Sequence, residues 1–208
     1  MVTIVVLADA RFIRSERSTS YIPYGLNSPC GPSYSDTPLF MPIRPLHRND
    51  VLPKVEEAQG LTNQLRDSYE MMPLPEIYSE EVIGLPGPEE ISASQNVTID
   101  YIIVSHLLVF VDIVCTDNTI PRDILHPHRR ALWQQLRLEI LNFLCSMHGT
   151  MAQVPHVSND ITLPCVREAS CNGPRSGFTR DSRNFLIASA VRDVFSRLQH
   201  KYSLLSNQ

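Results

Sequence analysis

Three polar side chains beside or within the most apolar parts of this sequence have the chemistry needed for acid–base catalysis. Asp9 follows the apolar run at residues 2–8, and His106 and Asp112 interrupt the apolar run at residues 101–115. If the second run is a strand, His106 and Asp112 share one of its faces. A histidine beside a carboxylate can act as a general base, so a small hydrolase or transferase is one hypothesis. The reading we favour is a hydrogen-bonded core histidine and aspartates that end strands.

A second set of residues could bind a metal ion. His148, His156, Cys165 and Cys171 are separated by 8, 9 and 6 positions, whereas the ligands of zinc fingers come in tight pairs. The sequence also contains none of the short signatures of serine hydrolases, phosphate-binding loops, zinc proteases or dithiol redox proteins. We therefore expect no metal and no cofactor, and we favour a protein that is not an enzyme.

Charge is divided unevenly along the chain. Residues 1–121 hold 7 basic and 16 acidic side chains, and residues 122–208 hold 11 basic and 6 acidic ones. Two such halves would attract each other or recruit different partners. Arg183, Arg192 and Arg197 in the basic half could contact the phosphates of RNA. Aromatic residues are scarce between them, so a solvated helix face, or a match to the acidic half of the chain, is the favoured reading.

The five cysteines and the N-terminal residues bear on location. An odd number of cysteines, two of them in apolar segments, predicts reduced thiols and a cytoplasmic protein. The apolar run at residues 2–8 is too short for a signal peptide and lacks a preceding basic residue. Without a signal, Asn96-Val97-Thr98 is not expected to be glycosylated, although it matches the acceptor pattern. Residues 101–115 are too few to span a membrane and are expected to lie in the core.

The elements that would position these residues include both strands and helices. Residues 2–8, 97–104 and 107–114 are rich in β-branched and aromatic side chains and are predicted as strands. Because no good turn signal separates the last two, one long buried helix at 97–114 is the alternative. Residues 10–49 and 72–96 are proline-rich and are predicted to be irregular. The expected fold is a single α+β or α/β domain, with a small sheet against about three helices.

Three helices are expected from apolar residues spaced three or four apart. They cover residues 51–71, residues 127–148, and a last helix that Asp181 caps. The helix at 127–148 is apolar over more than one stripe, which is typical of a central helix or of an interface. Trp133, Leu136, Ile140 and Phe143 are the residues expected at such an interface.

The function that these observations favour is a non-enzymatic interaction protein, regulatory or structural, that assembles as a homo-oligomer through amphipathic helices. Its basic residues are almost all arginine, 16 of 18. Such a composition is compatible with a compact genome, so a viral accessory protein is one example of this class. The hydrolase or transferase and the arginine-mediated RNA-binding protein are the alternatives.

Overall fold

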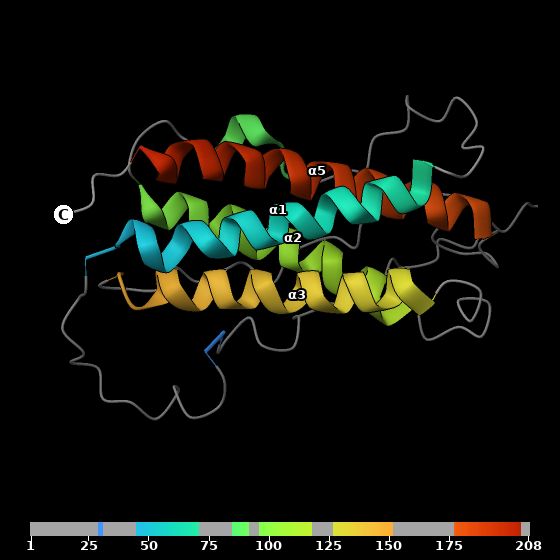
Figure 1. Cartoon of the computed structure of the whole chain (residues 1–208), viewed down its shortest axis with the longest axis horizontal. Coiled ribbons are helices and arrows are strands. Elements are labelled where there is room, and N and C mark those ends of the chain that lie inside the picture. The colour runs from blue at the N-terminus through green and yellow to red at the C-terminus, as the bar shows by residue number, and fades with distance from the viewer. Residues whose placement is uncertain are drawn as a thin grey trace, which may run out of the picture.

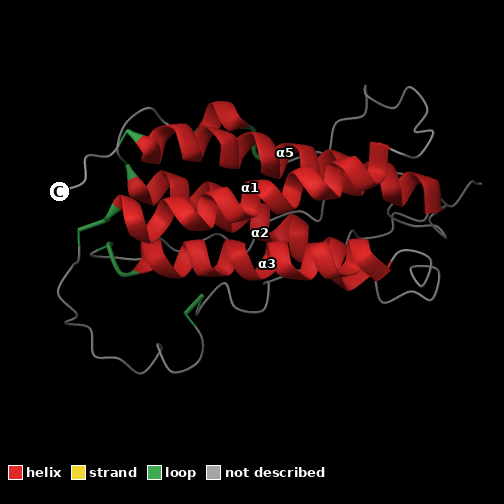
Figure 2. Ribbon diagram, viewed as in Figure 1, coloured by secondary structure: helices red, strands yellow, loops and turns green. Residues whose placement is uncertain are grey.

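Four α-helices make up most of the described part of this chain. The computed structural model describes residues 29–30, 45–70, 85–91, 96–117, 127–151 and 177–204. The helices are α1 (Arg48–Glu70), α2 (Val97–Asp117), α3 (Pro127–His148) and α5 (Gly177–Ser203), and a single turn of 3-10 helix, η3, covers Pro88–Glu90 (Figures 1 and 2). No strand occurs within the described ranges. The prediction of an α+β or α/β fold with a small sheet is therefore wrong.

Contacts near the helix ends establish the direction of each helix. The Trp133 indole, near the start of α3, donates a hydrogen bond to the Tyr69 hydroxyl at the end of α1, over 3.1 Å. The Gln59 side chain in the middle of α1 donates to Ser196 of α5, over 2.7 Å, and Glu56, one turn earlier in α1, accepts from Gln199, one turn later in α5, over 3.4 Å. Asp100 at the start of α2 accepts a hydrogen bond from Lys201 at the end of α5. Helices α1 and α2 thus run in one direction, and α3 and α5 run in the other (Figure 1).

The packing of the helices follows from these directions. α1 packs on α3 and α5, and α2 packs mainly on α3 and less extensively on α5. α1 and α2 therefore occupy opposite corners of the bundle, and every neighbouring pair is antiparallel. The connections at residues 71–96 and 149–176 each join helix ends at opposite ends of the bundle. Residues 118–126 join two helix ends that lie at the same end.

α2 replaces the two strands predicted at residues 97–104 and 107–114. Asn96 caps the helix: its side-chain oxygen accepts a hydrogen bond from the backbone N–H of Thr98, over 3.1 Å. Asp100 lies in the first turn, where a carboxylate favours helix formation. From Tyr101 to Val114 nearly every side chain is buried. Because α2 is buried on nearly all sides, its sequence lacks the spacing of apolar and polar residues that identifies an amphipathic helix. Its many β-branched residues then favour the prediction of strands.

The predicted helices at 51–71 and 127–148 are confirmed as α1 and α3, and the last predicted helix is confirmed as α5, which begins four residues before Asp181. The residues of α3 that were expected to face a partner fill the core instead. Phe143 meets the rings of Phe195 and Tyr202 edge-on, with ring centroids 5.7 and 6.2 Å apart. The apolar faces of all four helices therefore meet in one core.

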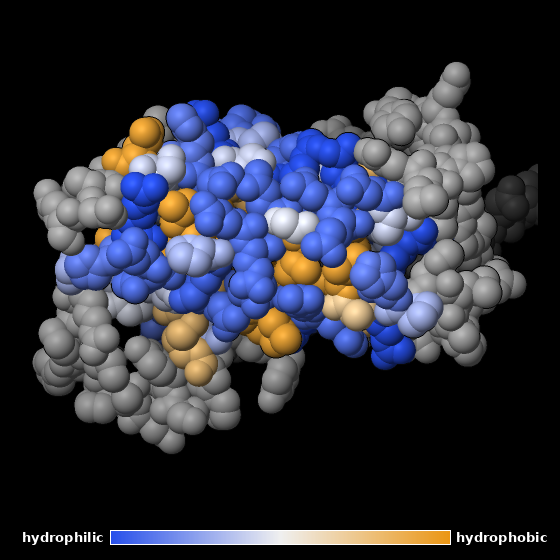
Figure 3. Space-filling view, viewed as in Figure 1, coloured by the Kyte–Doolittle hydropathy of each residue, from blue (hydrophilic) through white to orange (hydrophobic). Residues whose placement is uncertain are grey.

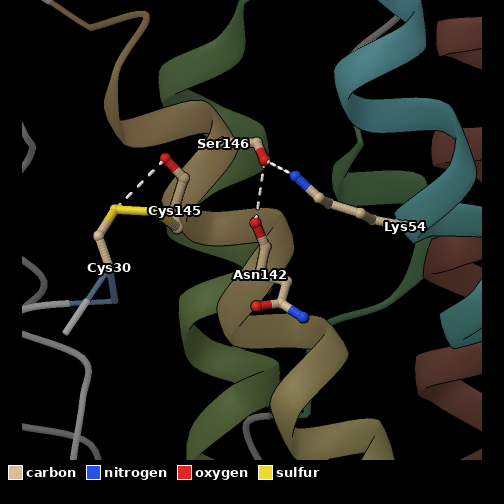
Figure 4. The surroundings of a disulfide bond; sticks show 5 residues. All are labelled: Cys30, Lys54, Asn142, Cys145 and Ser146. Carbon is tan, nitrogen blue, oxygen red and sulfur yellow. Dashed lines mark hydrogen bonds between the residues drawn. A yellow bond between two sulfur atoms is a disulfide. The ribbon is translucent and has the colours of Figure 1, made fainter.

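A disulfide bond joins Cys30 to Cys145 near the end of α3, across 115 positions of sequence (Figure 4). The sulfur of Cys30 also lies 3.6 Å from the carbonyl oxygen of Cys145. That contact is not a hydrogen bond, because a disulfide sulfur carries no proton. The next residue of α3, Ser146, accepts a hydrogen bond from Lys54 of α1 and donates one to the Asn142 carbonyl (Figure 4). The prediction that all five cysteines are reduced is wrong for Cys30 and Cys145.

The segments predicted to be irregular overlap the described residues in part. α1 begins at Arg48, within the segment predicted as irregular at 10–49. In the segment at 72–96, η3 and the following Ile91 are described, and Ile91 lies in the core. The strand predicted at 2–8 lies outside the described residues.

Candidate binding surface

The structure does not bring the three catalytic candidates together. His106 and Asp112 lie on α2, where six residues place them about 120° apart around the helix axis. Asp112 forms an ion pair with Arg137 of α3. His106 is half-buried, and burial lowers its pKa, an effect that the charge of Glu90 opposes. Asp9 lies outside the described residues. Asp112 therefore joins two helices, and its ion pair with Arg137 does not involve His106.

Of the four metal-ligand candidates, His148 alone lies among the described residues. His148 ends α3, is half-buried, and has its pKa lowered by burial. His156, Cys165 and Cys171 lie outside the described residues. Within the ranges that the structure describes, no three His, Cys, Asp or Glu side chains are grouped so that they could hold a metal ion.

The three arginines proposed for RNA contact have different surroundings. Arg183 is buried and donates to the side-chain oxygen of Asn184, over 3.0 and 3.2 Å. Arg192 donates to the carboxylate of Asp193, over 2.5 and 2.8 Å. Arg197 alone of the three is exposed. They do not form one exposed basic surface on α5.

A buried polar cluster joins the start of α2 to the end of α5. The Asp100 carboxylate is fully buried and accepts hydrogen bonds from Lys201, over 2.7 and 2.9 Å, and from the Tyr202 hydroxyl, over 2.6 Å. Burial raises the pKa of Asp100, and the contacts with Lys201 and Tyr202 oppose that rise. Burial and the adjacent carboxylate raise the pKa of Tyr202. Sequence reasoning missed this cluster, whose signal was a charged residue in the first turn of a very apolar segment.

A second buried polar cluster lies at the other end of the bundle. The Tyr69 hydroxyl accepts the hydrogen bond of Trp133, and the Arg129 guanidinium lies 4.5 Å from the centre of the Tyr69 ring. Arg129 also donates to the Ser68 carbonyl, over 2.5 Å. Burial raises the pKa of Tyr69, while hydrogen bonds to Trp133 and Asn184 lower it. Each cluster joins two helices through hydrogen bonds, and its charged side chains have partners within the chain.

The residues expected at a homodimer interface lie inside the single chain. Trp133, Leu136, Ile140 and Phe143 have no exposed surface. The large hydrophobic side chains that are exposed within the described part of the chain are Leu138, at 55%, and Leu204, at 72%. The surface shown in Figure 3 is accordingly mostly hydrophilic, with small hydrophobic areas between. Assembly through helix faces stays a prediction, and it would have to use other residues.

The outer face of α1 is a continuous row of exposed residues that includes four carboxylates. We call it the acidic α1 face; its members are Asp50, Pro53, Glu56, Glu57, Gly60, Asn63, Gln64 and Asp67, and all are exposed. Successive members follow one side of the helix over five turns. The face carries four carboxylates and no basic residue. It would therefore attract a basic surface on another molecule.

Gly60 lies at the middle of the acidic α1 face. Glycine within a helix costs about 1 kcal/mol relative to alanine. A Cβ atom at this position would meet nothing within 4 Å, so packing within the chain does not require glycine here. A glycine on an exposed helix face allows another backbone to approach closely. The acidic α1 face is therefore the candidate binding surface.

α2 is long and apolar enough to cross a membrane by length and composition alone, over Val97–Cys115. In the bundle, 67% of that stretch is buried against the rest of the chain. The core helices of soluble proteins have the same properties, so this feature is weak evidence for a membrane span.

No protein-family model matches this chain, and searches of the curated proteins and of the solved structures find no significant match.

Proposed function

We propose that this protein is a non-enzymatic regulatory ligand that binds another protein outside the reducing cytoplasm. The observation that carries the proposal is the order of directions of the described helices: two parallel helices are followed by two in the opposite sense, with 26 or more residues between α1 and α2 and between α3 and α5. This topology is typical of the growth-hormone and cytokine bundles. A shared topology is an argument by analogy, so the proposal also depends on the chemistry of the chain.

The described polar groups support a binding role over a catalytic one. The buried carboxylates Asp100 and Asp112 are each paired with a cation from another helix. A catalytic carboxylate or histidine would instead need to reach a substrate. Among the described residues, His106 and Asp112 are separated around α2, Arg183 is buried and Arg192 is paired with Asp193, so they favour neither a hydrolase or transferase nor an RNA-binding protein.

The disulfide supports the proposed location. Disulfides persist in secreted proteins and are rare in the reducing cytoplasm. The Cys30–Cys145 bond attaches the chain before α1 to the end of α3. We therefore propose an extracellular site of action in place of the cytoplasmic location that the cysteine count favoured.

The partner that suits the acidic α1 face is a protein with a basic surface. Charge pairs of this kind accelerate association and favour one orientation over others. No ion pair joins the carboxylates of this face to a basic residue of the described helices, so a basic partner would supply that charge, and Gly60 would let it approach α1 closely.

Binding of the labelled, disulfide-bonded protein to intact cells of its own organism tests the proposal. The test variant is Glu56→Gln, Glu57→Gln and Asp67→Asn, which removes three negative charges from the acidic α1 face. The matched control is Gln134→Lys, Gln135→Lys and Asn142→Lys, which changes the net charge equally at exposed positions of α3.

We expect saturable binding that the unlabelled protein competes away, that weakens at high salt, and that the α1 variant reduces at least tenfold. The α3 variant should bind like the wild type. Absence of saturable binding to any cell type of the organism would overturn the function. Equal loss of binding in both variants would show that the acidic α1 face is not the contact surface.

A further inference from the structure

We propose that Asn96 carries an N-linked glycan. Asn96-Val97-Thr98 is the one place in the sequence where an Asn is followed, after a residue other than proline, by Ser or Thr. The sequence alone argued against its use, because reduced cysteines implied a cytoplasmic protein. The Cys30–Cys145 disulfide reverses that argument. The inference rests on the proposed function in one respect, the passage of the chain through an oxidising secretory compartment.

The structure leaves this acceptor accessible. Asn96 and Thr98 are both exposed, and Val97 between them is half-buried, so both polar side chains of the motif face outward at the start of α2. A glycan needs such a position because it must remain in water after the chain has folded. The motif also lies outside the buried cluster of Asp100 and Lys201, only four residues further along.

The cap that Asn96 makes on α2 is compatible with the modification. The Asn96 side-chain oxygen accepts the hydrogen bond from the Thr98 N–H, and its backbone oxygen accepts one from the Asp100 N–H, over 3.4 Å. The glycan is attached to the other side-chain atom, Nδ2. The oxygen that caps the helix therefore keeps its role in the modified protein.

The reaction is a transfer of an oligosaccharide from a lipid pyrophosphate donor in the secretory compartment. Asn96 Nδ2 attacks the first carbon of the donor sugar, and a nitrogen–carbon bond forms. The carbon–oxygen bond to the pyrophosphate breaks, the lipid pyrophosphate leaves, and the amide nitrogen loses one proton. No oxidant or reductant takes part.

The position of the glycan is also compatible with binding through the acidic α1 face. α2 and α1 occupy opposite corners of the bundle, so a glycan on α2 leaves the acidic α1 face open to a partner. The same glycan covers the end of the most apolar helix with a soluble group.

The experiment uses the full chain, secreted from eukaryotic cells behind a cleavable secretion signal. Asn96→Asp removes the acceptor and keeps a good helix cap. Thr98→Ala removes the motif, and Thr98→Ser preserves it. The readouts are gel mobility before and after peptide-N-glycosidase, the mass of the peptide that contains residue 96, and the bonding state of Cys30 and Cys145 in the same sample.

We expect a glycosidase-sensitive form for the wild type and Thr98→Ser, and none for Asn96→Asp and Thr98→Ala, with similar helical content in all four. The same glycopeptide should occur in protein isolated from its own cells. Secreted, disulfide-bonded protein with an unmodified Asn96 would overturn the glycan and leave the proposed function standing. Natural protein retained in the cytoplasm with free Cys30 and Cys145 would overturn the location on which both depend.

Discussion

At the residue scale, the informative groups of this protein are the buried charges. Asp100 is held by Lys201 and Tyr202, and Asp112 by Arg137, each across two helices. A carboxylate in an apolar core must be paired because an isolated buried charge is very costly. Sequence reasoning placed His106 and Asp112 together because it assumed a strand with a repeat of two. In a helix the same spacing separates them, so a wrong element led to a wrong pairing of side chains.

Removal of the cation from the Asp100 cluster should be strongly destabilising. Lys201→Met leaves the buried Asp100 carboxylate with only the Tyr202 hydroxyl, which should lower the free energy of unfolding by about 3–5 kcal/mol at neutral pH. Adding Asp100→Asn should recover most of that loss, since the double variant has no buried charge at this place. Chemical denaturation of the wild type, both single variants and the double variant measures the coupling. Additive effects of the two substitutions would show that the pair is not coupled.

The same cluster makes stability depend on pH. Burial raises the pKa of Asp100 above its ordinary value, so the folded chain holds this proton at pH values where the unfolded chain has lost it. The contribution of Asp100 to stability is therefore fully present below its unfolded pKa, about 4, and is lost as the pH rises through its folded pKa. Unfolding free energy measured against pH should show this decline in the wild type and not in Asp100→Asn. Parallel curves for the two proteins would contradict the assignment.

At the element scale, three of the described helices were predicted directly from the sequence, and the fourth, α2, was predicted only as the alternative to two strands at 97–114. In α1, α3 and α5, apolar residues recur three or four positions apart, which indicates a helix with one apolar face. α2 is buried on nearly all sides, so its only signals were the cap at Asn96, the acidic first turn and a length beyond that of ordinary strands. The error at α2 created the predicted sheet and so the wrong fold class. The disulfide partner of Cys145 was also beyond prediction, because Cys30 lies in a turn 115 positions away, and the sequence alone does not show which distant segments meet.

α1 contains one residue that is unfavourable for its own element. Gly60→Ala should raise the free energy of unfolding by about 1 kcal/mol, because alanine is the better helix former and the added Cβ atom meets no neighbour. Thermal or urea unfolding of the variant measures the gain. The matched control is Ala58→Gly, at a buried position of the same helix, which should destabilise by more than the propensity difference. A loss of stability in Gly60→Ala would show that an unrecognised contact needs the glycine.

At the scale of the whole molecule, the division of charge along the sequence becomes contact between the two halves. The ion pairs Asp100–Lys201 and Asp112–Arg137 each join an acid from the first half to a cation from the second. The sequence predicted this mutual attraction but not its partners. The disulfide adds a covalent link between the same halves.

Loss of the disulfide should weaken the entire bundle. The double substitution Cys30→Ser and Cys145→Ser should lower the free energy of unfolding by about 2–4 kcal/mol, because a long loop in the unfolded chain is no longer closed. Cys115→Ser is the control, since Cys115 is a free cysteine of α2 and its pKa is raised to about 12, mainly by burial. Denaturation of both variants with reductant absent gives the comparison. Equal stability of the double variant and the wild type would mean that the bond does not restrain the unfolded chain.

The helical bundle with its Cys30–Cys145 disulfide is proposed to act outside the reducing cytoplasm. The most direct test is mass spectrometry of the natural protein, isolated from its own organism with free thiols alkylated at the moment of lysis. We expect a cross-linked peptide pair containing Cys30 and Cys145, with Cys115 alkylated after denaturation. Recovery of Cys30 and Cys145 as separate alkylated peptides from intact, folded protein would contradict it.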